Sequence, residues 1–434
     1  MSSDVPIRPG EPFDPPTPPE VIRPEPLPSV PGDTLTPAQR DAEGEPLPVV
    51  YPVPAEPARP GAAPLLLQPP HPGLGFAALW SVAFLMVTYG ALIAVLIVAL
   101  LVQAVMAGDI QAYLQSLVEV EEAPDQPTAD QSVKPPLKIS PSLGQAIGVS
   151  ILAAEVASVI FALLIIRLVV GAGWRRKLAL YRPSVAQIVL TVLSLPAFLI
   201  LPAGIHELVK KVLPSMMDEN MQVMQEMFGQ WPLWLGILAI GVGPGLGEEL
   251  WCRGFLGRGL VARWGWTAGV LWTSLLFGLL HVDPAYAAVT AAMGLWLHFV
   301  YLTTRSLWAS ILLHTLNNST AVVAARFAHD PALQAIDKPA DQIPWQVYVA
   351  AALLLTAVGW ALYRCRGRLV PASGGTGPAW HPAFPGAEYP PPDSGTVVAR
   401  PLWPGWLASA AVILALAALV GVIWLAETGR LAGL

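Results

Sequence analysis

Three groups of polar side chains interrupt apolar stretches of this 434-residue chain. The first group lies in the segment Gly-Glu-Glu-Leu-Trp-Cys-Arg-Gly, residues 247–254, and the other two are short histidine motifs. The paired residues in each group are four positions apart, so each pair shares one face of a helix. The pairs are Glu249 with Arg253, Phe277 with His281, and His314 with Asn318. Because an ionisable side chain within a membrane costs about 2.5–3.5 kcal/mol, the three groups together predict a functional site.

The first two groups supply the residue types that activate water. A carboxylate held in a site of low dielectric constant is suited to general-base catalysis. We therefore expect Glu248 to activate a water molecule together with His281. Glu249 is expected to pair with Arg253 and to fix the geometry of its helix. Taken alone, this pair is also explained as a structural ion pair within the membrane.

The third group predicts stabilisation of negative charge. We expect His314 and Asn318 to stabilise the oxyanion that forms when water attacks a peptide carbonyl. A second arrangement remains open, in which His281, His314 and a glutamate bind a zinc ion that holds the water. The chain lacks the H-E-x-x-H sequence of common zinc proteases, which favours the metal-free arrangement. The cofactor is therefore left open, with zinc as the candidate.

The composition indicates that helices in a lipid bilayer position these groups. Hydrophobic residues make up 54% of the chain and charged residues only 12%, against about 25% charged residues in soluble domains. We predict an all-α, polytopic transmembrane helical bundle with about eight or nine spans. The candidate spans are residues 76–106, 143–168, 185–206, 231–252, 266–282, 284–303, 305–328, 344–363 and 402–426.

The loops between these spans alternate in charge. Basic residues gather in loops that the span order places on one side of the membrane, and acidic residues gather on the other side. The positive-inside rule then puts the N-terminus in the cytoplasm. We predict an integral protein of a bacterial plasma membrane whose partners are the lipid bilayer and a membrane-associated substrate. The chain has no basic stripe, so no nucleic-acid partner is expected.

The N-terminal segment differs from the rest in composition. Residues 1–74 contain about 22 of the 46 prolines, and ten acidic residues against four arginines. Such a segment buries too little apolar surface to offset its ordering entropy, so we predict a disordered, acidic, proline-rich cytoplasmic tail. The other predicted regions are a first transmembrane helix with an external loop (75–142), a protease-like core (143–330), an external loop with the eighth helix (331–368), a Pro/Gly-rich cytoplasmic linker (369–401) and a C-terminal transmembrane helix (402–434).

A glycine-rich stretch, residues 241–247, comes directly before the two glutamates. We expect it to interrupt its helix and either to be buried in protein or to border a water-filled cavity, because non-helical backbone at membrane depth needs protein or water around it. Glu155 and His298 are single polar residues in other spans, and for each we expect a hydrogen bond within the bundle. Phe277 is expected to serve in packing only, and Asn318 alone would be explained as a contact between helices.

The three motifs, taken in order, resemble those of the CPBP (ABI) intramembrane proteases. That family includes type II CAAX prenyl endopeptidases and bacteriocin-processing enzymes. The resemblance covers roughly residues 143–330, and Cys252 stands where the family more often has Phe. It implies an all-helical bundle with an internal catalytic cavity. It also implies that the polar site residues are Glu248, Glu249, Arg253, His281, His314 and Asn318.

The leading hypothesis is therefore an intramembrane endopeptidase of the CAAX type, either metal-dependent or glutamate-dependent. It would hydrolyse a peptide bond in a membrane-associated protein or peptide. The alternative is a non-proteolytic membrane scaffold, or a bacteriocin-immunity-type protein, that retains the fold.

Overall fold

The computed structural model describes residues 72–116, 118–120, 137–171, 174–212, 227–228, 231–327, 342–371, 396–399, 401–428 and 430–433. The predicted disordered tail therefore lies outside the described residues, except for residues 72–74. Helices dominate the described part, so the predicted all-α helical bundle is confirmed. The strands are short and form two separate two-stranded ribbons.

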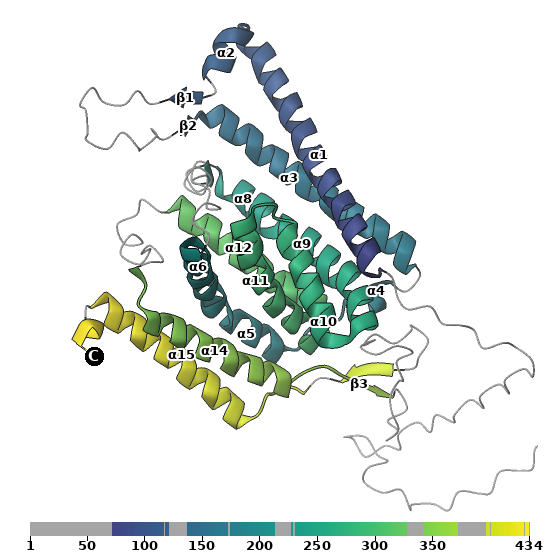
Figure 1. Ribbon diagram of the computed structural model, residues 1–434, viewed down its shortest axis with the longest axis vertical. Helices are drawn as coiled ribbons and strands as arrows, with labels where there is room; N and C mark the ends of the chain where they lie inside the picture. Colours follow the sequence, from purple (N-terminus) through teal and green to yellow (C-terminus); the bar gives the residue numbers. More distant parts are fainter. Residues whose placement is uncertain are drawn as a thin grey trace, which may run out of the picture. The chain divides into compact units, whose positions relative to one another are not determined.

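The first two long helices pack along each other (Figure 1). They are α1 (Leu74–Ala107) and α3 (Pro141–Ile165), and α3 continues as the π-helical segment η2 (Ile166–Val170). The connection between them contains α2 (Ile110–Ser116) and the antiparallel strands β1 (Val118–Val120) and β2 (Leu137–Ile139). The Ser140 hydroxyl accepts a hydrogen bond from the amide of Leu143, which caps the start of α3.

The central helices, together with the turn between α10 and α11, carry all three polar groups. They are α4 (Trp174–Lys177), α5 (Val185–Leu193), α6 (Leu195–Val212), α8 (Leu233–Gly236), η4 (Ile237–Val242), α9 (Gly243–Glu249), η5 (Leu250–Gly257), α10 (Arg258–Leu279), α11 (Pro284–Thr304) and α12 (Leu307–Arg326). A capping box between Ser184 and Gln187 begins α5. Trp251 of η5 stacks on Phe84 of α1 with ring centroids 4.8 Å apart, which joins the α1–α3 pair to the centre.

The last two long helices also pack along each other (Figure 1). They are α14 (Trp345–Arg364) and α15 (Trp406–Glu427), followed by the 3₁₀ turn η7 (Arg430–Gly433). The ends of the predicted linker pair as antiparallel strands β3 (Arg368–Pro371) and β4 (Thr396–Ala399), and the residues between them lie outside the described part. The C-terminal helix buries Ala408, Val412 and Leu419, so it is packed as well as anchored.

Seven segments in the described part are long and apolar enough to cross a membrane. Their bounds are Leu74–Ala107, Pro141–Val170, Val185–Val212, Leu233–Leu279, Tyr286–Thr304, Trp345–Arg364 and Trp406–Glu427. The fourth contains two of the expected spans, because Gly265 takes φ 73° and turns the chain within it. The seventh expected span, residues 305–328, corresponds to α12, whose 20 residues are not apolar enough to be counted among these segments. The chain is thus an integral membrane protein.

The predicted helix break at residues 241–247 is wrong. The backbone runs from η4 through α9 into η5 with helical φ and ψ values, and Gly243 has φ −56° and ψ −64°. Neighbouring helices approach these glycines so closely that a Cβ atom at Gly241 would lie 3.5 Å from the Ser319 backbone. Packing against α3 and α12 therefore holds the segment helical, and its irregularity takes the form of π-helical turns.

Candidate functional site

The first polar group is a buried ion pair that joins two helices. Glu249 and Arg253 are both completely buried, and Glu249 Oε1 accepts a hydrogen bond of 2.7 Å from Arg253 Nη1. Arg253 Nη2 donates to the carbonyl of Gly294 on α11 at 3.1 Å. The guanidinium also lies 4.4 Å from the centre of the Phe277 ring. Arg253 therefore fastens η5 to α10 and α11.

His314 connects the two glutamates. Its Nδ1 atom lies 2.9 Å from Glu249 Oε1, and its Nε2 atom lies 3.8 Å from Glu248 Oε2. Because a carboxylate only accepts hydrogen bonds, Nδ1 is the donor in the first contact. Glu249 thus orients the imidazole so that Nε2 faces Glu248. The sequence contains no signal for this contact between residues 65 positions apart.

Phe277 lies between the two histidines. Its ring contacts His281 and His314 edge-on, with centroid distances of 5.2 Å and 5.9 Å. The expectation that Phe277 serves in packing only is therefore incomplete, since its ring also holds the Arg253 guanidinium. His281 Nδ1 lies 3.0 Å from the Phe277 carbonyl and must donate to it, which makes Nε2 the basic nitrogen of a neutral ring.

His281 lies in the turn between α10 and α11, just beyond the end of α10 at Leu279. The next residue, Val282, has φ 64°, a conformation that β-branched residues rarely adopt. Asp283 then caps α11, where its Oδ1 atom accepts a hydrogen bond of 3.1 Å from the amide of Tyr286. The turn that carries the imidazole is therefore fixed by backbone geometry and a helix cap.

This cap gives a modest stability prediction. Replacing Asp283 by Ala removes the acceptor for the Tyr286 amide, and we expect the free energy of unfolding to fall by about 1 kcal/mol. The measurement is unfolding of the detergent-solubilised protein, with Asp283→Asn as the control that keeps a capping oxygen. An equal loss in the Asn variant would contradict the capping explanation.

Asn318 is engaged with the π-helical segment. Its Nδ2 atom donates to the carbonyl of Ile240 at 3.0 Å, and its Oδ1 atom accepts from Asn317 Nδ2 at 3.0 Å. This contact joins α12 to η4, as expected of a polar residue between membrane helices. The Asn318 side chain lies one turn from His314 on α12, because the two residues are four positions apart.

The six predicted site residues thus come from neighbouring elements. Contacts link Glu248, Glu249, Arg253 and His314 directly, and Phe277 links His281 to this group. Two carboxylate atoms, Glu248 Oε2 and Glu249 Oε2, are buried and have no hydrogen-bond partner among the described residues. Unsatisfied buried carboxylate atoms are uncommon and are typical of sites that bind or react.

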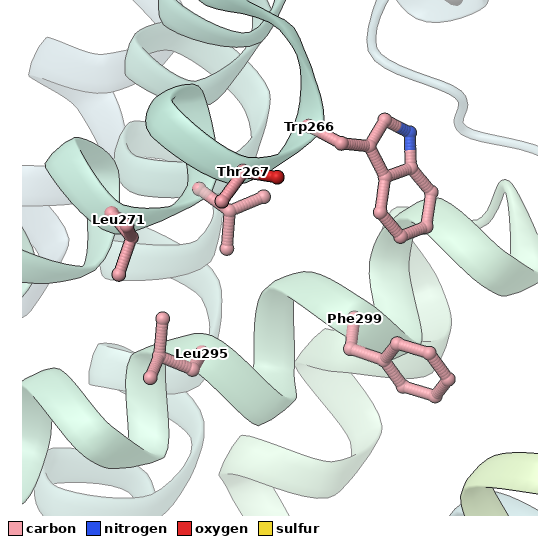
Figure 2. Close-up of a pocket in the computed structure, with 6 residues that line it drawn as sticks. Trp266, Thr267, Leu271, Leu295 and Phe299 are labelled. Carbon is pink, nitrogen blue, oxygen red and sulfur yellow. The ribbon is translucent and has the colours of Figure 1, made fainter.

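A separate apolar groove lies between α10 and α11 and has a volume of about 250 Å³. Figure 2 shows Trp266, Thr267 and Leu271 on one side of it and Leu295 and Phe299 on the other. None of the six predicted site residues lines this groove. It is therefore distinct from the polar site.

The zinc arrangement finds no ligand set in the part of the chain that the structure describes. There, no three His, Cys, Asp or Glu side chains are placed to bind a metal ion together. Glu249 is already bound to Arg253 and to His314. We therefore derive no step through a metal ion.

Fold and site together define a polytopic membrane protein with a buried site of glutamate, histidine, arginine and asparagine. Residues 230–320 match the family described as type II CAAX prenyl endopeptidase Rce1-like. All three motifs fall within this match, which confirms the resemblance predicted from them. This part of the chain therefore carries an Rce1-like domain.

One curated relative supports the same class. The chain is 30% identical over 106 residues to "Putative membrane peptidase YdiL" of Bacillus subtilis (strain 168). The matched region is 24% of this chain and spans 43% of the relative. No solved structure matches the chain.

Proposed function

We propose that this protein is an intramembrane endopeptidase of the CAAX type. It hydrolyses a peptide bond in a membrane-associated protein or peptide. The observation that carries the proposal is the position of His314 between two glutamates. Glu249 orients the His314 imidazole, whose other nitrogen faces the carboxylate of Glu248. The match of residues 230–320 to a protease family supports the interpretation of these three side chains as groups that hydrolyse a peptide bond.

In the proposed reaction Glu248 is the general base. It takes a proton from water as the water oxygen attacks the peptide carbonyl, and it returns that proton to the leaving amine. His281 acts with Glu248 on the same water through its basic Nε2 atom. His314 stabilises the oxyanion by donating from Nε2, which requires a proton on that nitrogen in addition to the Nδ1 proton that is bound to Glu249. Asn318 also donates to the oxyanion, for which it must exchange its hydrogen bond to Ile240 for one to the substrate.

Glu249 and Arg253 hold the geometry for this reaction. Glu249 aligns His314, and Arg253 compensates the buried charge of Glu249. The reaction needs no group beyond these side chains and water. We propose a bacterial plasma membrane as the location, with the N-terminus in the cytoplasm, and residues 143–330 as the catalytic core.

The direct test compares membrane peptides from cells that carry the intact protein with those from cells that carry Glu248→Ala. We expect at least one membrane-associated peptide or protein to be cleaved only in cells with the intact protein. Glu427→Gln is the matched control, because this exposed glutamate lies at the end of α15. Identical peptide profiles for the intact protein and Glu248→Ala would reject the proposal.

A second candidate is a non-proteolytic scaffold with the same fold. The observation that favours it is the set of contacts from Arg253 to Glu249, Gly294 and Phe277, which we call the Arg253 clamp. These contacts hold the helices together whether or not any peptide bond is cleaved. A scaffold predicts that Glu248→Ala, if it is expressed and stable, preserves the cellular phenotype. An endopeptidase predicts that this variant reproduces the phenotype of a deletion.

A further inference from the structure

A short chain of hydrogen bonds joins α12 to the π-helical segment η4 beside the site. Asn317 Nδ2 donates to Asn318 Oδ1 at 3.0 Å, and Asn318 Nδ2 donates to the carbonyl of Ile240 at 3.0 Å. Both asparagine side chains are partly buried. Asn318 thus uses both ends of its amide, and the residue that holds the oxygen end, Asn317, is not one of the six predicted site residues.

The sequence explains why the Ile240 carbonyl is available to Asn318. In an α-helix this carbonyl would accept from the amide of residue 244, but that residue is Pro244, which has no N–H group. The helices also approach each other closely here, because a Cβ atom at Gly245 would lie 3.2 Å from the amide nitrogen of Thr315. The Asn318 amide therefore reaches a backbone acceptor that lacks its α-helical donor.

These contacts decide which end of the Asn318 amide faces η4. A carbonyl oxygen only accepts hydrogen bonds, so Ile240 requires the Asn318 nitrogen, and the Asn318 oxygen then faces Asn317. With the amide turned over, Asn318 Oδ1 would face the Ile240 carbonyl oxygen, and two acceptors would meet. In the resting protein, Ile240 and Asn317 therefore both hold the amide in one orientation.

The orientation of this amide matters for the proposed reaction. Asn318 must leave Ile240 before it can donate to the oxyanion, and from that point Ile240 no longer fixes the amide. A free amide can turn over, and its oxygen would then repel the negative charge that forms on the substrate. The hydrogen bond from Asn317 does not have to break, because it acts on the other end of the amide.

We propose that Asn317 is a positioning residue, which keeps the Asn318 nitrogen directed at the oxyanion after Asn318 has left Ile240. This inference rests on the proposed function, because it needs an oxyanion to form at the site. Asn317 donates to Asn318 Oδ1 throughout, and no proton moves along this pair. The same hydrogen bond polarises the amide, which makes the Asn318 N–H a better donor.

A cleavage assay tests the positioning role. Asn317→Leu keeps roughly the size of the side chain and removes the donor, and we expect kcat to fall about 3- to 10-fold with little change in KM, as for the loss of one neutral hydrogen bond. Asn317→Gln should recover part of this loss, because its amide can still donate. Equal losses in the two variants contradict the positioning role.

A matched control lies on the same helix. The Thr320 hydroxyl donates to the Leu316 carbonyl of α12 at 2.8 Å, so Thr320→Val removes a hydrogen bond within α12 and should leave kcat unchanged. An equal fall in kcat in Thr320→Val and Asn317→Leu would mean that any weakening of α12 impairs cleavage, which overturns the proposal.

A second background asks whether Asn317 acts through Asn318. In Asn318→Ala the amide is gone, so the further substitution Asn317→Leu should lower kcat no more. A loss as large as the one in the intact protein would contradict the proposal, because Asn317 would then act by another route.

Unfolding in detergent tests the contact without any substrate. The free energy of unfolding is measured for Asn317→Leu, Asn318→Ala and the double variant. We expect the loss in the double variant to be smaller than the sum of the two single losses, because the two side chains share one hydrogen bond. Losses that simply add overturn the proposal. If the intact protein cleaves nothing, the proposed function fails, while the unfolding result still decides whether Asn317 holds the Asn318 amide.

Discussion

Glu248→Gln is expected to lower kcat by about 10²- to 10⁴-fold, which is the usual contribution of a general base. The substitution keeps the size of the side chain and removes only its ability to take a proton from water. The contacts that hold the fold nearby, from Arg253 to Glu249 and Gly294, do not involve Glu248. We therefore expect the thermal unfolding temperature in detergent to stay close to that of the intact protein.

The neighbouring glutamate provides the matched comparison. Glu249→Gln removes the charge that pairs with Arg253 and aligns His314, so this variant should lose stability as well as activity. Cleavage of an identified substrate and unfolding should be measured for both variants. An inactive but stable Glu248→Gln protein beside a destabilised Glu249→Gln protein is the expected pattern. Full activity of Glu248→Gln would exclude Glu248 as the base.

Arg253→Met is expected to lower the free energy of unfolding by about 3–5 kcal/mol. Methionine fills similar space but leaves the Glu249 carboxylate completely buried without its cation. The substitution also removes the contact with the Phe277 ring and the hydrogen bond to Gly294. Unfolding in detergent, followed by circular dichroism or by a thermal shift, measures the effect.

A double variant separates the ion pair from simple packing. Replacing both Glu249 and Arg253 by Met removes both charges, so no buried charge remains unpaired at these positions. We expect this protein to be more stable than Arg253→Met alone, because breaking a buried pair costs more than removing it. The comparison needs the free energy of unfolding of Glu249→Met, Arg253→Met and the double variant. If the loss in the double variant equals the sum of the two single losses, the two charges do not stabilise each other and the Arg253 clamp is wrongly assigned.

The lengths of the apolar runs in the sequence predicted most of the long helices. Apolar runs identified the spans, and the helix boundaries in the described part agree closely with them, as in 76–106 against Leu74–Ala107. The error at residues 241–247 arose because glycine and proline break an isolated helix. In the structure Thr315, Ser319, Glu155 and Ser158 pack against these glycines, so tertiary contact overrides local preference.

The contacts among the six predicted residues could be derived only in part from the sequence. Spacing of four residues correctly paired Glu249 with Arg253, because both lie on one helix. The contact between Glu249 and His314 depends on how α12 packs against α9, and helical periodicity carries no information about that packing. His298, expected to form a hydrogen bond within the bundle, has no partner for either ring nitrogen among the described residues.

The polar character of α12 also bears on how the chain enters the membrane during synthesis. Alone among the long central helices, α12 is not apolar enough to count as a span within the described residues. Its histidine and asparagine groups find their partners on η4 and α9, which are made earlier. We therefore expect α12 to enter the lipid bilayer from the translocon only when it is packed against the helices already synthesised. A ribosome-bound chain that lacks η4 and α9 should fail to insert α12 into the membrane.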